Sequence, residues 1–361
     1  MPTGNINVLT FDFECNTIAK GNPYCQEGKA VCLGYKIEDT PTYCIFDFSG
    51  LTEDVFSSSL CVAFNAKFDL GWLRRLGFKL PKQVWCVQLA EYMLSRQTLP
   101  WLSLDECAQR YGFPGKLDVV KTEYWDKNID TDQIPAGILS DYCRQDVDIT
   151  YAIYCKQQEE FAKHPKLYRL FKLACQDLLV LQEMEWNGLV YNEKLCEERA
   201  EECRKAMQEH LAALTSVYPG VPINFNSGDQ LSAFLYGGTI YEDIKIPDGI
   251  YKSGLKKGQP KWKNGVVEHQ LPRMVEPLPK SEMKKAGLYA TDEGTLRKLK
   301  GPFAKKFVEP LLTIAKLDKL IGTYYAGLPK QNKEMKWKPN IIHGQLNQCV
   351  TATGRLSASK P

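Results

Sequence analysis

Four carboxylates occur in three short segments whose spacing could bind divalent cations. Asp12 and Glu14 are two residues apart on a predicted strand, so both point to the same face. Asp69 follows a predicted buried strand at the start of a helix, and Tyr142 and Asp146 share one face of a later helix. Because oxygen ligands select hard cations, we expect two Mg²⁺ or Mn²⁺ ions, roughly 3.5 to 4 Å apart.

Each segment has a simpler explanation when it is taken alone. Asp12 and Glu14 could lie on a solvent-exposed strand edge, where carboxylates are common. Tyr142 could be a helix-packing residue, and Asn65 could be only a turn or cap residue. The combined order of D-x-E, N-x-x-x-D and Y-x-x-x-D favours a metal site over these separate explanations.

The surrounding sequence predicts the elements that position these residues. Alternating apolar residues predict a strand at 6–15 and further strands in the segments AVCLGYKIED, TYCIFDFSG and LCVAFN. Ser103 and Glu106 have the spacing of a capping box, and a long helix is predicted from about 139 to 163. We therefore expect an α/β domain, with antiparallel strands before helices, that ends near residue 165.

The second half of the chain has a different pattern. Helical periodicity extends from about 168 to 214 with a break at Gly188, and returns from about 293 to 325. The intervening segment 247–279 is rich in glycine, proline and lysine, which predicts a solvent-exposed basic loop or hairpin.

Charge is distributed unevenly although the net charge is only +3. Residues 1–160 contain 15 Lys+Arg and 22 Asp+Glu, whereas residues 161–361 contain 31 and 21. From residue 245 onward, 23 basic residues face 9 acidic ones. This asymmetry predicts a carboxylate metal site in the first half and a polyanion-binding surface in the second.

The 13 cysteines are scattered without a CxxC pair, and the four histidines are far apart in the sequence. This spacing argues against a zinc site and favours buried free thiols in a reducing compartment. No apolar run approaches the roughly 20 residues that cross a bilayer, and the N-terminus lacks a signal pattern. We therefore expect a cytoplasmic protein without a membrane partner.

The three acidic segments resemble those of the DEDD exonuclease superfamily in its tyrosine-bearing variant. The resemblance implies a ribonuclease H-like exonuclease domain with a mixed sheet at 1–165, which removes nucleotides hydrolytically from a 3′ end. The metal ligands that it implies are Asp12, Glu14, Asp69 and Asp146.

The same resemblance assigns Tyr142 to the attacking water, which it would orient or deprotonate. Because the ordinary pKa of tyrosine is about 10, orientation of the water is the more plausible role. Asp148 is a weaker alternative to Asp146, because it lies six residues from Tyr142 instead of four.

Four later segments resemble those that follow the proofreading domain in family A DNA polymerases, especially in the phage-type branch. They are LVLQEMEWNGLVYNEK, FNSGDQLSAFLYGG, LLTIAKLDKLIGTYYAGL and HGQLNQCVTATGRLSASKP. The likeness implies a mainly helical, thumb-like DNA-binding region at 166–344 and the start of an incomplete polymerase palm at 345–361. The substrate- or DNA-contacting residues expected from these likenesses are Asn65, Thr351, Thr353, Gly354, Arg355 and Ser357.

The segments that would carry the polymerase aspartates are absent from this sequence. We therefore expect a proofreading 3′-5′ exonuclease that also grips primer-template DNA and does not polymerise by itself. A split polymerase, in which a second chain supplies palm and fingers, is favoured over a shortened form of a longer chain. Two other interpretations stay open: a DNA-clamping subunit with a dormant exonuclease, and a free-standing DEDD exoribonuclease.

Overall fold

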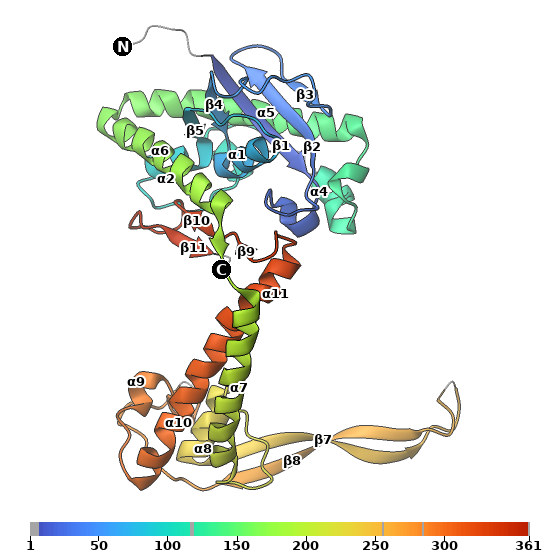
Figure 1. Ribbon diagram of the computed structural model, residues 1–361, viewed down its shortest axis with the longest axis vertical. Coiled ribbons are helices and arrows are strands. Elements are labelled where there is room, and N and C mark those ends of the chain that lie inside the picture. Colours follow the sequence, from blue (N-terminus) through green and yellow to red (C-terminus); the bar gives the residue numbers. More distant parts are fainter. Residues whose placement is uncertain (1–6, 116–118, 255, 284, 360–361) are drawn as a thin grey trace. The chain divides into compact units, whose positions relative to one another are not determined.

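The protein is described here from a computed structural model that covers residues 7–115, 119–254, 256–283 and 285–359 (Figure 1). Ile6, where the first strand was predicted to begin, lies outside the described residues. The chain forms two compact units, and each is described by itself. The first comprises Met1–Asn192 and Leu328–Pro361, and the second comprises Glu193–Gly327.

A five-stranded mixed sheet forms the centre of the first unit (Figure 1). Its strands are β1 (Val8–Cys15), β2 (Ala30–Ile37), β3 (Tyr43–Ile45), β4 (Leu60–Ala63) and β5 (Gln83–Cys86), in the order β3-β2-β1-β4-β5. The pairs β1–β2 and β2–β3 are antiparallel, and β1–β4 and β4–β5 are parallel. The predicted α/β domain with a mixed sheet is therefore confirmed, although β5 was not predicted as a strand.

Helices follow the strands where the sequence changes to helical periodicity. Those of the first unit are α1 (Ala66–Arg75), α2 (Val87–Leu94), α3 (Leu104–Arg110), α4 (Val119–Glu123), α5 (Ala136–Ala162), α6 (Pro165–Asn187) and, at its later boundary, α11 (Gly327–Glu334). The capping box predicted for Ser103 and Glu106 is present at the start of α3. The long predicted helix is α5, which begins after Pro135.

The core of the first unit extends beyond the boundary predicted at residue 165. Helix α6 contributes Phe171, Cys175 and Leu178 to the same buried cluster as the sheet. Trp85 of β5 packs against Phe171 with ring centroids 4.7 Å apart. The compact unit therefore extends to residue 192, because α6 buries its apolar face against the sheet domain.

The segment after residue 328 also belongs to the first unit, in contrast to the predicted division at residue 344. Strand β9 (Ile341–Ile342) pairs with β6 (Leu189–Val190), and β10 (Gln345–Asn347) pairs with β11 (Ser357–Ser359). The imidazole of His343 stacks on Tyr24 at 4.4 Å, and its Nδ1 lies 2.7 Å from the Glu185 carbonyl oxygen. These long-range contacts hold the segment against the exonuclease-like domain.

The second unit is a helical assembly with one long hairpin (Figure 1). Its helices are α7 (Glu193–Thr215), α8 (Gly228–Tyr236), α9 (Glu293–Leu296), α10 (Pro302–Lys319) and the π-helix Leu320–Tyr325. Helices α7 to α10 share an apolar cluster. Strands β7 (Gly238–Ile250) and β8 (Pro260–Leu271) pair antiparallel. The helical region and the basic hairpin predicted for this half are therefore confirmed.

Within the described residues, no helix is both long enough and apolar enough to span a membrane.

Helix α5 lies very close to the sheet at Gly34 of β2. A Cβ atom placed on Gly34 would lie 2.7 Å from the Cys143 Sγ and 2.9 Å from the Val147 Cγ2, both on α5. Real Cβ contacts do not occur at these distances, so a larger residue would displace the helix. Gly34 is paired with Asp12 of β1, and the close approach therefore lies directly beside that carboxylate.

We predict that Gly34→Ala destabilises the protein by about 1–3 kcal/mol, because the added methyl group overpacks the contact between α5 and β2. Urea unfolding of the purified variant would measure this loss. Gly137→Ala is the matched control, since Gly137 is an exposed helical glycine of α5 with open space around its Cα. That variant should gain about 0.5–1 kcal/mol. Equal stability of the two variants would contradict the proposed close packing.

Candidate functional site

Strand β1 presents two carboxylates on the face that α5 covers. Phe11 and Phe13 point to the opposite face, where they are buried in the core. Asp12 and Glu14 alternate with them, as the period of a strand requires. Asp12 is half-buried and Glu14 is 8% exposed, so these carboxylates do not form the solvent-exposed edge face that the pattern alone permitted.

Asp69 reaches β1 from the first turn of α1. Strand β1 pairs with β4 only as far as Thr10, so the amide of Phe13 lies beyond this ladder. That amide donates a hydrogen bond to the Asp69 Oδ1 at 3.1 Å. Asp69 is 2% exposed. The hydrogen bond holds the Asp69 carboxylate against β1, where Asp12 is a neighbour of like charge.

Helix α5 covers the same face of the sheet and contributes Cys143, Asp146 and Tyr142 to this region. The Cys143 Sγ lies 3.7 Å from the Asp12 carbonyl oxygen and within 4.8 Å of carboxylate oxygens of Asp12 and Glu14. Asp146 is one turn further along the same helix face and is 5% exposed. Tyr142, four residues before Asp146, packs edge-on against Trp125 with centroids 5.9 Å apart.

Asp148, the weaker alternative ligand, has a different environment. Its carboxylate binds the Lys36 ammonium at 3.0 Å and is 52% exposed. It also accepts a hydrogen bond from the Thr42 hydroxyl. Asp148 therefore lies on the surface beside β2, and Asp146 is the buried residue of this pair.

The electrostatics of the site favour binding of a cation. Burial, followed by the negative charge of Asp12, raises the pKa of Asp69 well above its usual range, against the hydrogen bond from the Phe13 amide. Burial and the neighbouring carboxylates also raise the pKa of the Cys15 thiol. Buried carboxylates of like charge destabilise one another unless a cation lies between them. These hard oxygen donors therefore fit Mg²⁺ or Mn²⁺.

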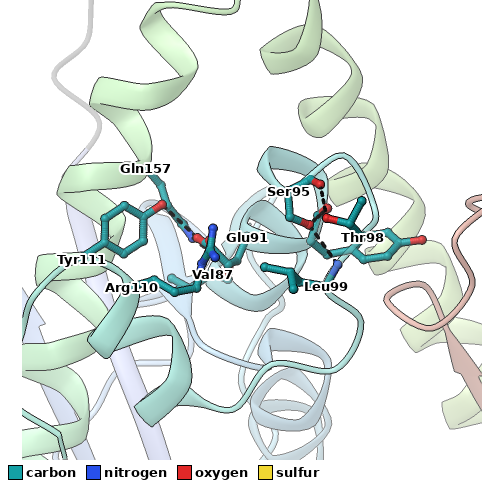
Figure 2. A network of polar contacts seen from close by, with 9 residues as sticks. Val87, Glu91, Ser95, Thr98, Leu99, Arg110, Tyr111 and Gln157 are labelled. Carbon is teal, nitrogen blue, oxygen red and sulfur yellow. Dashed lines mark hydrogen bonds and ion pairs between the residues drawn. The ribbon is translucent and has the colours of Figure 1, made fainter.

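A polar network holds α5 in register with the helices beside it (Figure 2). The buried Glu91 carboxylate accepts hydrogen bonds from Arg110 at 2.7 Å, Tyr111 at 2.8 Å and Gln157 of α5 at 3.1 Å. Gln157 also donates to the Val87 carbonyl oxygen. Because every partner lies on α2, α3 or α5 or directly beside them, the network fixes the helix that carries Tyr142 and Asp146.

A hollow of about 200 Å³ lies beside the start of α1. Asn65 lines it and is exposed, and its side chain makes no hydrogen bond that caps α1. Lys20, Lys67 and Trp101 also line the hollow. Trp101 is 49% exposed.

The turn that presents Trp101 is built by hydrogen bonds at the end of α2 (Figure 2). Ser95 donates to the Tyr92 carbonyl oxygen at 2.8 Å, and Thr98 donates to the Ser95 carbonyl oxygen at 2.6 Å. Sequence reasoning missed Trp101. Its position directly after Leu99 and Pro100, in a turn between two helices, was the available signal of an exposed aromatic residue.

The predicted DNA-contacting residues near the end of the chain lie on and around the β10–β11 hairpin. Thr351 accepts a hydrogen bond from the Tyr92 hydroxyl through its carbonyl oxygen at 2.6 Å. Its own hydroxyl donates to the Arg355 carbonyl oxygen, which closes the turn around Gly354. Thr353 and Arg355 are exposed, and Ser357 begins β11. These residues therefore form a surface turn held against α2, and the carboxylate cluster is built from other elements.

We predict that Asp69→Asn stabilises the metal-free protein at neutral pH. A raised pKa means that the fold favours protonated Asp69, so stability falls as pH rises from the ordinary value, about 3.9, through the raised value. Asparagine carries no charge, so the variant avoids this loss of folding stability. Its Tm should be about 2–4 °C higher at pH 7.5 in EDTA. Wild type should gain stability on addition of Mg²⁺ or Mn²⁺ and the variant should gain much less. A lower Tm of Asp69→Asn in EDTA would refute the repulsion argument.

Comparisons with known proteins agree with this architecture. Residues 6–162 match the family described as 3′-5′ exonuclease, and residues 266–361 match DNA polymerase family A. The POL domain of Pol1 from M. smegmatis, solved in complex with DNA primer-template and dNTP, aligns with a TM-score of 0.67 at 20% identity. That alignment covers 99% of this chain and 52% of the mycobacterial chain, and it shows a shared fold.

Curated relatives are DNA polymerases I from bacteria. The enzyme from Synechocystis sp. is 29% identical over 82% of this chain and 26% of its own length. The thermostable enzyme from Thermus filiformis is 30% identical over 50% of this chain and 17% of its own length. The chain thus spans about a quarter or less of these two relatives. Its residues 6–162 are thus similar to 3′-5′ exonuclease domains, and its residues 266–361 are similar to part of the DNA polymerases of family A.

Proposed function

We propose that this chain hydrolyses DNA from the 3′ end as the proofreading part of a family A DNA polymerase. The observation that carries the proposal is the group formed by Asp12 and Glu14 of β1 with the buried Asp69, whose pKa is raised by burial and by Asp12. The motif spacing assigns the buried Asp146 to the same group as the fourth ligand. The match of residues 6–162 to 3′-5′ exonucleases supports the reaction class. The motif spacing supports the tyrosine-bearing DEDD type, and the phage-type likeness stays a prediction.

The proposed mechanism assigns separate tasks to the side chains. The four carboxylates would hold two divalent ions, and the bound ions would supply Lewis acidity for phosphodiester hydrolysis. Tyr142 orients the attacking water with its hydroxyl, and its ring is held by the contact with Trp125. Attack of this water on phosphorus breaks the bond to the 3′ oxygen and releases a nucleoside monophosphate.

The hollow beside α1 is suited to the terminal nucleotide. Asn65 offers an exposed amide one turn before Asp69, and Trp101 offers an exposed ring on which a base can stack. Lys20 contributes positive charge at the same hollow. A strand end bound there would direct its last phosphodiester toward the carboxylates, which favours single-stranded or frayed ends as substrates.

The second unit is proposed to bind the duplex part of the substrate. Lys261 and Lys263 of the β7–β8 hairpin lie close to Asp248, and Lys245 donates to Asn264. The basic excess after residue 245 supplies the electrostatic attraction to phosphates. A further chain with palm and fingers stays a prediction, which copurification with the tagged protein would test.

The proposed activity is tested by digestion of 5′-labelled single-stranded DNA with Mg²⁺. Wild type should give a stepwise ladder, and Asp12→Ala/Glu14→Ala should reduce the rate by at least about 1,000-fold because ion binding is lost. Tyr142→Phe keeps all four ligands and should reduce it by about 100-fold.

Two outcomes would support other functions. Wild type that binds primer-template DNA and cuts nothing with Mg²⁺ or Mn²⁺ would indicate a clamping subunit. Faster cutting of RNA than of DNA of the same sequence would indicate an exoribonuclease. Equal activity of wild type and the double variant would exclude the carboxylate site.

Stacking of the terminal base on Trp101 predicts a second change in the same assay. Trp101→Ala should raise KM for single-stranded DNA by about 5- to 100-fold, since a stacked base contributes about 1–3 kcal/mol. Trp101→Phe keeps an aromatic face and should remain close to wild type. An unchanged KM in Trp101→Ala would place the strand end elsewhere.

A further inference from the structure

Three cysteines from three separate elements meet beneath α5. Cys32 lies on β2, Cys44 on the edge strand β3, and Cys143 on α5. Their Sγ atoms all lie within 4.8 Å of one another. This cluster has no role in the proposed hydrolysis, and its interpretation does not depend on that function.

The backbone geometry explains why the sulfur atoms converge. Gly34 is paired with Cys44 across β2 and β3, and Cys32 is two residues from Gly34 on the same strand. All three positions therefore face the same side of the sheet. Because Gly34 has no side chain, the Cys143 side chain of α5 can lie against the strand backbone, next to Cys32 and Cys44.

The surroundings of the cluster are apolar and accessible from one side. Val120, Ile134 and Leu139 pack with Cys32 and Cys143 in one buried group. Cys44 is only half-buried and lies against this group from the edge of the sheet. An ion could therefore enter past Cys44 and would be shielded from water on its other sides.

We propose that Cys32, Cys44 and Cys143 bind one Zn²⁺ ion as three thiolates. Sulfur ligands at about 2.3 Å from a tetrahedral ion lie about 3.8 Å apart, which small side-chain rotations from the present cluster can reach. Each thiol releases its proton to solvent on binding, and water completes the fourth position on the open side of Cys44. Zn²⁺ would join α5 to β2 and β3.

This site is chemically distinct from the carboxylate site beside it. Thiolates select soft or borderline ions, whereas carboxylates select Mg²⁺ and Mn²⁺. Cys143 lies between the two groups, because its Sγ is also within 4.8 Å of Asp12 and Glu14 oxygens. A zinc ion on the three thiolates would thus fix the part of α5 that positions Tyr142 and Asp146.

The test is metal titration of the full-length reduced protein in excess Mg²⁺, which occupies the carboxylates. Co²⁺ serves as the probe, because coordination by thiolates produces a sulfur-to-cobalt charge-transfer absorption that oxygen ligands do not. One equivalent should saturate this band, and one equivalent of Zn²⁺ should displace it.

Cys44→Ala should weaken Zn²⁺ binding by more than about 100-fold, beyond the loss typical of residues that only support a ligand. Cys44 is the preferred position because its half-buried edge location keeps the effect on folding small. Cys155→Ala is the matched control, since Cys155 is a half-buried cysteine further along α5 and should leave the titration unchanged. Zinc should also raise Tm of wild type and leave Cys44→Ala unaffected.

Three results would overturn the proposal. The first is a folded wild type without the charge-transfer band, and the second is equal Zn²⁺ affinity in wild type and Cys44→Ala. The third is a protein that holds no zinc and carries a disulfide within the cluster, seen as a mass lower by two hydrogens. That result would make the three cysteines a redox link.

Discussion

The contact of helix α5 with strands β1 to β3 is the packing interaction on which both proposed sites depend. At Gly34 the helix lies against the strand backbone, since any side chain there would overlap Cys143 and Val147. This approach brings Cys143 close both to the carboxylates of β1 and to the other two cysteines. Protein interiors are close-packed, so a shift of one helix would change the geometry of both groups together.

Two buried carboxylates of this domain, Glu91 and Asp69, lie in opposite electrostatic environments. Glu91 is fully hydrogen-bonded by Arg110, Tyr111 and Gln157, and thereby joins three helices (Figure 2). Asp69 is buried beside Asp12, and its pKa is raised by burial and by that neighbouring charge. Glu91 stabilises the fold without a metal ion, because its charge is compensated by hydrogen bonds. Asp69 would be stabilised by a bound cation, because its neighbour has the same charge.

Local patterns predicted most elements of the first unit, because their periods are set by neighbours in the sequence. Strand alternation placed β1, and the Ser103 and Glu106 pair placed the start of α3. Strand β5 was missed because its four residues run directly into α2 without a turn signal. The attachment of α6 to this compact unit has no local signal, because it depends on Phe171 and Leu178, which pack on elements distant in sequence.

The sequence by itself determined that Asp12 and Glu14 share a face and that Tyr142 and Asp146 share another, since the strand and helix periods require it. Only the tertiary structure decided that Asp146 is buried and that Asp148 is exposed and paired with Lys36. It also gathered Cys32, Cys44 and Cys143, whose spacing had argued against zinc. The physical reason is that long-range convergence depends on how elements pack, and a close approach such as that at Gly34 leaves no periodic signal in the chain.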